Sequence, residues 1–493
     1  MKIHILLAVI LFISCKSKTE EKSSLGKSNI VLIYTDDQTY ESIRKLGNSE
    51  IYTPNLDKFV DQATTFTHAY NMGGWHGAVC VASRSMMMSG AHIWRAQKQE
   101  DRWILNDPMA IDRTWGKLMS KNGYNTYMTG KWHIKTPANT VFDTVAHVRG
   151  GMPQYAKLYR QGVKKHKEIY KRGYNRPISK KDTTWSASDP KFEGFWKGGK
   201  HWSEVLKDDA LSFIQDASVK QAPFFMYLAF NAPHDPRQAP QEYVDMYPLE
   251  DISLPKSFLP EYPYKDSIGN SASLRDEALA PFPRTAYAVK KHRQEYYALI
   301  SHLDTQIGEI LKALKASGKM DNTYIFFTSD HGLAVGKHGL IGKQSLFDHS
   351  IRVPLMLMGP NIPKGKKIDQ DVYLQDVMAT SLDLAAIQKP SYVEFNSLLD
   401  FIKDTKKKSN YDGIYGAYRM HQRMIRKNGY KLLVYPKINK ILLFDMIQDP
   451  EEITDLSDMP EQSERIKLLF KDLLKLQKDM EDPLDLTALY NNL

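Results

Sequence analysis

The chain has 493 residues, of which 42% are hydrophobic and 25% are charged, and its formal net charge is +10. This length excludes a single small domain and fits one large globular domain with a smaller companion. The positive charge favours an anionic partner, although a lysine-rich surface is also an ordinary solvated surface.

The N-terminal residues predict export and a lipid anchor. An apolar run at residues 5–13 is too short to span a bilayer and suits the core of a signal peptide. A small residue before Cys15 resembles a bacterial lipobox, in which the cysteine becomes the lipidated N-terminus; an incidental cysteine after an ordinary signal peptide is the alternative. We predict a signal peptide at residues 1–14, a flexible lipidated tether at 15–28, and a lipoprotein at the periplasmic or outer-membrane surface of a Gram-negative bacterium.

Strand-like and helix-like patterns alternate along residues 29–390. The predicted strands are residues 29–35, 124–128, 224–230, 324–329 and 353–358, and the predicted helices are 56–63, 114–121, 203–216 and 293–317. This alternation predicts an α/β fold with a large, doubly wound, mainly parallel sheet flanked by helices. Four of the strands end beside polar residues: Asp36 and Asp37, Lys131 and His133, His234, and Asp330 and His331. Ligands of such sheets bind beyond the carboxyl ends of the strands, so these residues are candidates for one site.

The chain past residue 390 has a different texture, with short antiparallel strand patterns at 423–435 and 438–444 and a helical pattern at 463–480. We predict a small α+β domain over 391–493. A basic, aromatic segment at 157–181 has three interpretations: a nucleic-acid surface, a solvated insertion, or a wall for an anionic polymer. The solvated insertion is favoured, and no nucleic-acid partner is expected.

Cys80 is the central feature of the sequence, because Cys15 is the only other cysteine and lipidation would leave Cys80 without a disulfide partner. A buried cysteine at the start of a helix is the ordinary alternative. Cys80-Val-Ala-Ser-Arg84, followed by Ser89-Gly90, resembles the signature of the type I sulfatases, whose cysteine is oxidised to formylglycine.

Further motifs match the same family in the same order. They are Thr35-Asp-Asp-Gln38, Thr53 to Asp57, Phe66 to Asn71, Thr129-Gly-Lys-Trp-His133, Pro233-His-Asp-Pro236, Thr328 to Gly332, Gly342-Lys343 with Arg352 to Pro354, and Leu443 to Asp445 with Asp449-Pro450. The resemblance spans most of the mature chain and implies a formylglycine-dependent sulfatase of the alkaline-phosphatase superfamily. The pattern around residues 42–48 and 73–95 resembles bacterial sulfatases that act on algal polymers such as ulvan or carrageenan.

The resemblance implies a metal ion held by Asp36, Asp37, Asp330, His331 and position 80. The oxygen-rich ligands suit Ca²⁺, with Mg²⁺ the less favoured choice, better than Zn²⁺. Adjacent aspartates also cap helices, but two carboxylates in one turn repel each other without a cation.

The resemblance also implies a role for each remaining site residue. A hydroxyl of the hydrated aldehyde at position 80 attacks sulfur, and Arg84 holds the hydrate. Lys131 and Lys343 bind sulfate oxygens. His234 protonates the leaving oxygen, and His133 takes the proton whose loss expels sulfate. Histidine suits such transfers because its ordinary pKa lies near neutrality.

Ala82 stands where the family has proline, which implies maturation by a radical-SAM formylglycine-generating enzyme. Trp75, His76 and Arg237 are candidate substrate contacts, with local packing as the alternative for each. The predicted function is hydrolysis of sulfate monoesters of sulfated polysaccharides or oligosaccharides. The alternatives are a phosphoester or phosphonate hydrolase of the same superfamily and a non-catalytic, carbohydrate-binding surface lipoprotein.

Overall fold

The structure is a computed structural model that describes residues 27–153, 179–181, 185–404 and 406–493. The predicted signal peptide, Cys15, nearly all of the predicted tether and most of the basic segment lie outside these residues. Within them, no helix combines the length and the apolar character needed to cross a bilayer.

The larger sheet has eight strands in the order β5-β4-β6-β1-β7-β8-β2-β9. Only β8 runs against its neighbours; the other pairs are parallel. The strands are β1 (Asn29–Thr35), β2 (Thr64–Tyr70), β4 (Asn125–Lys131), β5 (Thr144–Arg149), β6 (Phe224–Ala229), β7 (Thr323–Ser329), β8 (Arg352–Met358) and β9 (Lys366–Tyr373). This mixed, mainly parallel sheet confirms the predicted fold class.

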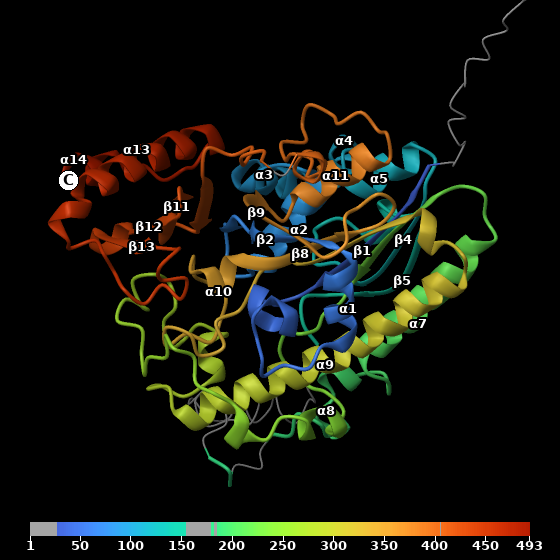
Figure 1. Ribbon diagram of the computed structural model, residues 1–493, viewed down its shortest axis with the longest axis horizontal. Coiled ribbons are helices and arrows are strands. Elements are labelled where there is room, and N and C mark those ends of the chain that lie inside the picture. Colours follow the sequence, from blue (N-terminus) through green and yellow to red (C-terminus); the bar gives the residue numbers. More distant parts are fainter. Residues whose placement is uncertain (1–26, 154–178, 182–184, 405) are drawn as a thin grey trace, which may run out of the picture.

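Helices cover both faces of this sheet (Figure 1). They are α1 (Pro54–Gln62), α7 (Trp202–Ser218) and α9 (Ala286–Ala316) on one face, and α2 (Val79–Ser89), α3 (Ile93–Ile104), α5 (Trp115–Lys121) and α11 (Asp376–Leu384) on the other. Every residue of β1 and of β6 is buried, as expected for central strands covered on both sides. The apolar runs of these strands therefore form the core of the larger domain.

A buried carboxylate on the side of α9 binds the N-terminus of α1. Asp304 of α9 accepts hydrogen bonds from the backbone N–H groups of Asn55 (3.1 Å) and Leu56 (2.6 Å), at the N-terminus of α1. Such a bond satisfies N–H groups that a helix leaves without an internal partner. It fixes α1 and α9 as one unit beneath the sheet.

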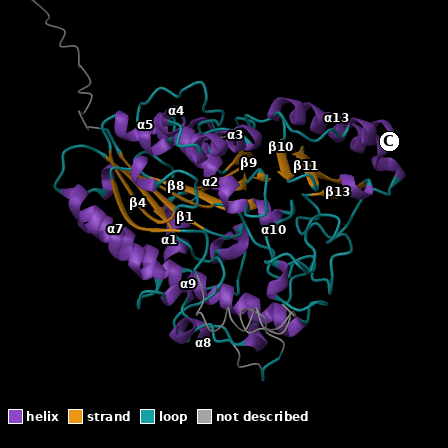
Figure 2. Cartoon of the chain, turned by 180° about the vertical axis from the view of Figure 1, so that it is seen from behind, coloured by secondary structure: helices purple, strands orange, loops and turns teal. Residues whose placement is uncertain are grey.

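The second sheet has five strands in the order β13-β12-β11-β10-β3, and α13 (Ser463–Met480) packs on it (Figure 2). Its strands are β3 (Gly73–Gly74), β10 (Ile414–Tyr418), β11 (Gln422–Lys427), β12 (Tyr430–Tyr435) and β13 (Lys440–Asp445). Short strands and one long helix confirm the predicted smaller α+β part. Gly73 has φ +87°, and a Cβ there would lie 2.0 Å from the Ala417 carbonyl oxygen, so the contact requires glycine. The second sheet is thereby joined to the chain segment that leads to Cys80.

Candidate active site

Cys80 lies at the second position of α2, and Arg84 lies one turn further along the same helix. Both side chains are buried, at 2% and 0% exposure. The Arg84 guanidinium donates to Asp330 Oδ2 (2.9 Å) and to the Lys131 carbonyl oxygen (2.9 Å), and it lies over the Tyr34 ring. Arg84 thus connects the nucleophile helix to the ends of β1, β4 and β7.

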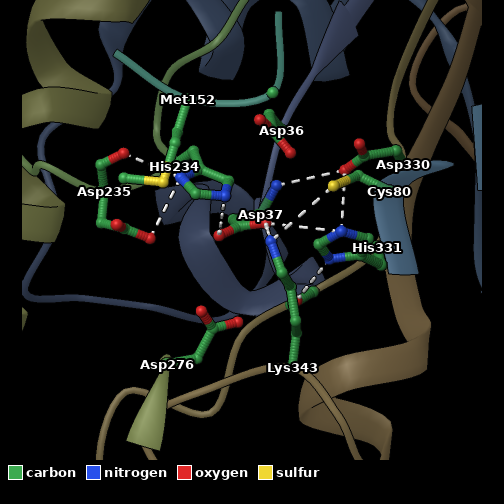
Figure 3. Close-up of polar contacts among 12 residues, drawn as sticks. Asp36, Asp37, Cys80, Met152, His234, Asp235, Asp276, Asp330, His331 and Lys343 are labelled. Carbon is green, nitrogen blue, oxygen red and sulfur yellow. Dashed lines mark hydrogen bonds and ion pairs between the residues drawn. The ribbon is translucent and has the colours of Figure 1, made fainter. Parts of the chain in front are cut away.

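The carboxyl ends of β1 and β7 bring three carboxylates together, as the strand pattern predicts (Figure 3). Asp37 has φ +66°, and its N–H donates to Asp330 Oδ1 (3.2 Å). Nε2 of His331 lies 3.4 Å from Asp37 Oδ1 and 3.5 Å from Asp330 Oδ1. Burial and the like charge of Asp330 raise the pKa of Asp36 well above its ordinary value. The protein alone therefore provides an unfavourable environment for the third negative charge.

These residues fit a divalent cation. Oδ1 of Asp36, Oδ2 of Asp37 and Nε2 of His331 are buried and have no hydrogen-bond partner among the described residues. One potential ligand atom from each of Asp36, Cys80, Asp330 and His331 lies within 4.8 Å of the others. Buried polar groups without partners are costly, and carboxylate oxygens are the ligands of hard cations. The fit rests on these unpaired atoms and on the donor chemistry.

Two lysines lie between the carboxylates and Cys80. Lys131 forms an ion pair with Asp36, and Lys343 Nζ lies 2.7 Å from Asp37 Oδ1 and 4.0 Å from Cys80 Sγ. Burial alone would raise the pKa of Cys80, but Lys131, Lys343 and His133 outweigh it and hold this pKa well below its ordinary value. The environment of residue 80 therefore stabilises negative charge.

Two histidines lie at the site, one beside Cys80 and one beside Asp37. His133 Nδ1 lies 3.5 Å from Cys80 Sγ. His234 Nδ1 faces the carbonyl oxygen (2.8 Å) and Oδ1 (3.0 Å) of Asp235, and its Nε2 lies 3.9 Å from Asp37 Oδ2. Because Nδ1 of His234 faces two acceptors, it carries a hydrogen, and Nε2 donates a proton only from the doubly protonated ring.

The site opens into a cavity of about 580 Å³. Its lining includes four predicted site residues, namely Cys80, His133, His234 and Lys343. It also includes residues that the sequence analysis did not single out: Gly77, Ala78, Gly151, Met152, Pro153, Leu274, Arg275, Asp276 and Gln344. Most of these residues come from loops, which have no periodic sequence pattern from which a role could be predicted. Asp235 was within a recognised motif, and its place beside His234 was a signal that could have identified it.

The three candidate substrate contacts are not among the residues that line this cavity. Arg237 is 1% exposed and donates to His292 Nδ1 on α9, so its side chain is a buried packing element and does not line the cavity. Trp75 Nε1 donates to Glu100 Oε2 (3.0 Å), and His76 Nδ1 accepts from the Ala78 N–H (3.1 Å). Arg237 is therefore a packing residue, and substrate contact by Trp75 and His76 stays a prediction.

In the fold and the site together, a buried cysteine at a helix N-terminus lies against a cluster of carboxylates with unpaired oxygens at the strand ends, an arrangement that suits a metal-dependent hydrolase. A family profile described as "Sulfatase" matches residues 28–387, and a second, described as "N-sulphoglucosamine sulphohydrolase, C-terminal", matches residues 336–479. The chain belongs to the sulfatase family and is a sulfuric ester hydrolase. The family implies a formylglycine and a divalent metal ion.

Individual relatives agree with this assignment. The chain is 30% identical over 481 residues to an arylsulfatase of Clostridium perfringens, covering 92% of this chain and 95% of that protein. It is 26% identical to an ulvan-active sulfatase of Formosa agariphila, covering 91% and 81%. A solved structure of a protein in complex with its substrate D-glucosamine-2-N,6-O-disulfate has a TM-score of 0.71 at 20% identity, covering 93% and 99%, and shows the shared fold.

Proposed function

We propose that this enzyme removes sulfate groups from sulfated saccharides, using a formylglycine formed from Cys80 and a Ca²⁺ ion held by Asp36, Asp37, Asp330, His331 and position 80. The observation that carries the proposal is the position of Cys80 Sγ. It lies 3.5 Å from His133 Nδ1 and 4.0 Å from Lys343 Nζ, beside carboxylates with unpaired oxygens. The relative described as ulvan-active supports a saccharide substrate.

The charges of the site suit an anionic ester. Its three carboxylates, of Asp36, Asp37 and Asp330, face three permanent cations, Lys131, Lys343 and Arg84. A bound divalent ion adds positive charge, so the complete site attracts sulfate and withdraws charge from its oxygens. We assign to Lys131 and Lys343 the binding of the sulfate oxygens that do not react, and to Arg84 the holding of the formylglycine hydrate.

The two histidines perform the proton transfers. His234 lines the cavity, and its Nε2 donates a proton to the oxygen that leaves with the sugar. His133 lies beside residue 80 and accepts the proton whose loss releases sulfate. His133 is within 3.5 Å of Cys80 Sγ and His234 lines the cavity that would hold the ester, so both fulfil the positional requirement of general acid–base catalysis in this proposal.

The rival functions have less support. Phosphoester hydrolysis by a serine or threonine nucleophile with two zinc ions does not fit Cys80 and one aspartate-rich site. A non-catalytic relic would lack some of the reactive residues, yet Cys80, Arg84, Lys131, His133, His234 and Lys343 are all present.

The test is mass spectrometry of the peptide that contains residue 80, from protein made in its native host, combined with sulfate release from sulfated oligosaccharides. We expect a peptide lighter than the unmodified thiol, reaction with a hydrazide probe, and faster turnover of sulfate than of phosphate esters. A fully active enzyme with an unmodified thiol would contradict the mechanism, and faster phosphate turnover would contradict the function.

We also propose that Cys15 is lipidated and anchors the exported enzyme to a membrane, and that a radical-SAM maturase tolerates Ala82. The apolar run at residues 5–13 and the polar stretch after Cys15 support the anchor. Cys15→Ser should release the protein from membrane fractions and leave sulfate hydrolysis unchanged. A wild-type protein that starts at another residue and has no lipid would rule out the anchor.

A further inference from the structure

One wall of the active-site cavity is a continuous chain of polar contacts from the nucleophile loop to His234. Gln344 Nε2 donates to the Gly77 carbonyl oxygen (3.0 Å) and to Asp276 Oδ2 (2.6 Å). Asp276 also pairs with Arg275, whose guanidinium reaches both carboxylate oxygens of Asp235, with Nη2 3.2 Å from Oδ1. Asp235 in turn faces His234. We call Asp235, Arg275, Asp276 and Gln344 the rim wall; Asp235 and Asp276 lie close to the reactive side chains in Figure 3.

The rim wall contains more negative than positive charge. Burial of Asp235 would raise its pKa, but Arg275 and His234 hold that pKa well below its ordinary value. Asp235 is therefore ionised, and Asp276 binds two donors that suit a carboxylate. Two carboxylates and one guanidinium give the four residues of this wall about one net negative charge. Lys343, by contrast, places a cation at the floor of the cavity, paired with Asp37.

The position of the wall relates it to the leaving group. Arg275, Asp276 and Gln344 line the same cavity as Cys80 and His234. A sugar ring whose ester lies between residue 80 and His234 would therefore meet this wall with its neighbouring substituents. Carboxylates accept hydrogen bonds from hydroxyl or amino groups and repel further anions.

We propose that the rim wall determines specificity for the sugar: it accepts hydrogen-bond donors of the ring beside the ester and disfavours a second sulfate or a carboxylate there. This inference rests on the proposed saccharide sulfatase function and names the substrate class more narrowly. The preferred substrate carries one sulfate at the reacting position and free hydroxyl or amino groups next to it.

The experiment compares two glycosides with the same ring, one with a single sulfate and one with a second sulfate on the adjacent hydroxyl. Wild-type enzyme should show a kcat/KM for the singly sulfated sugar that is at least roughly tenfold higher, mainly through KM, because a unit charge a few ångströms away has about this effect at a partly solvated site. Asp276→Asn should reduce this preference about tenfold, whereas Arg275→Gln, which makes the wall more negative, should increase it. Asp266→Asn, on the same loop and exposed, is the matched control and should leave the ratio unchanged.

Opposite shifts by the two rim variants separate a charge effect from a general disturbance of the loop. A wild-type preference for the disulfated sugar overturns the proposal whether or not the variants fold, and so does equal preference in wild type and Asp276→Asn. Failure to release sulfate from both sugars and also from nitrophenyl sulfate would instead overturn the proposed function. If the enzyme hydrolyses nitrophenyl sulfate but prefers the disulfated sugar, the role of the rim wall in specificity is wrong and the proposed function stands.

Discussion

The active site and the interface between the two sheets each contain a buried group of charges, and the two groups differ in how completely they are paired. At the interface, Lys431 of β12 pairs with Asp348 and with Glu452 Oε1 (2.7 Å), and it donates to the Leu346 carbonyl oxygen (3.3 Å). Glu452 Oε2 accepts from the Asp348 N–H (2.6 Å). Every buried nitrogen and oxygen of these three side chains has a partner. We call Lys431, Asp348 and Glu452 the interface cluster.

The active site also combines buried carboxylates with lysine, but Asp36, Asp37 and His331 each have an atom without a hydrogen-bond partner in the part of the chain that the structure describes. A fully paired buried cluster holds elements together, and breaking it is costly. An incompletely paired cluster at strand ends is arranged for a ligand. The two clusters therefore differ in the pairing of their buried charged side chains, and we expect the incompletely paired cluster to bind a ligand.

The largest expected effect is that of Asp36→Asn on catalysis. Removing one carboxylate weakens the cation site, so sulfate release should fall by about 10⁴-fold, which corresponds to roughly 5 kcal/mol of transition-state stabilisation. Unfolding of the metal-free protein should change by only about 1 kcal/mol, because the wild-type carboxylate is itself destabilised by burial and by Asp330. Initial rates and urea unfolding measure the two effects. A variant with near wild-type turnover would place the cation elsewhere.

Lys431→Met should have the opposite effects, a large loss of stability and a small change in turnover. It leaves Asp348 and Glu452 buried without a cation, so the free energy of unfolding should fall by about 3–5 kcal/mol. The protein that remains folded should keep a kcat within about twofold of wild type, because Lys431 has no proposed catalytic role and does not line the cavity. Lys437→Met on the exposed turn of the same sheet is the control. Loss of kcat without loss of stability would remove the distinction between the two clusters.

His234→Ala should discriminate between leaving groups. A sugar alkoxide needs a proton more than nitrophenolate does, so sulfate release should fall about 10²- to 10³-fold for a saccharide and less than about tenfold for nitrophenyl sulfate. His338, which stacks on Phe347 and donates to the Glu452 carbonyl oxygen beside the interface cluster, provides the comparison. His338→Gln should alter both rates by the same small factor. Equal losses for His234→Ala on the two substrates would exclude it as the general acid.

The smallest expected effect is a pH dependence of stability from Glu452. Burial, together with Asp348, raises the pKa of Glu452 from 4.5 to about 7, although Lys431 opposes the shift. The folded protein then binds a proton that the unfolded chain has lost, so this contribution is complete below pH 4.5 and disappears as the pH rises through 7. Wild type should lose about 1–3 kcal/mol more than Glu452→Gln between pH 5 and pH 8, in denaturant titrations with metal chelated. Parallel pH profiles would show that Glu452 is ionised throughout.

The central strands and their terminal residues were predictable from sequence, whereas the edge strands were not. β1, β6, β7 and β8 are apolar runs, and polar side chains follow at the end of the first three, so pattern and topology coincide. β5 and β9 are edge strands with partly exposed residues, and β2 is rich in threonine, so none has a clear apolar run.

The reactive residues were predictable because they occur in short motifs, and the surroundings of the site were not. Arg237 belongs to such a motif, but only the packing of α9 shows that its side chain is buried against His292. Arg275, Asp276 and Gln344 meet through contacts between loops distant in sequence. No local pattern encodes such contacts.

Thermal unfolding of metal-stripped wild-type enzyme during a calcium titration tests the difference between the two clusters most directly. Because an ion that binds only the folded state stabilises it, Tm should rise with the logarithm of Ca²⁺ concentration once the site begins to fill. The rise should be absent in Asp36→Asn and preserved in Lys431→Met, which starts from a lower Tm. An unchanged wild-type Tm, or native protein with zinc at full occupancy and activity restored only by zinc, would contradict a calcium site at the unpaired carboxylates.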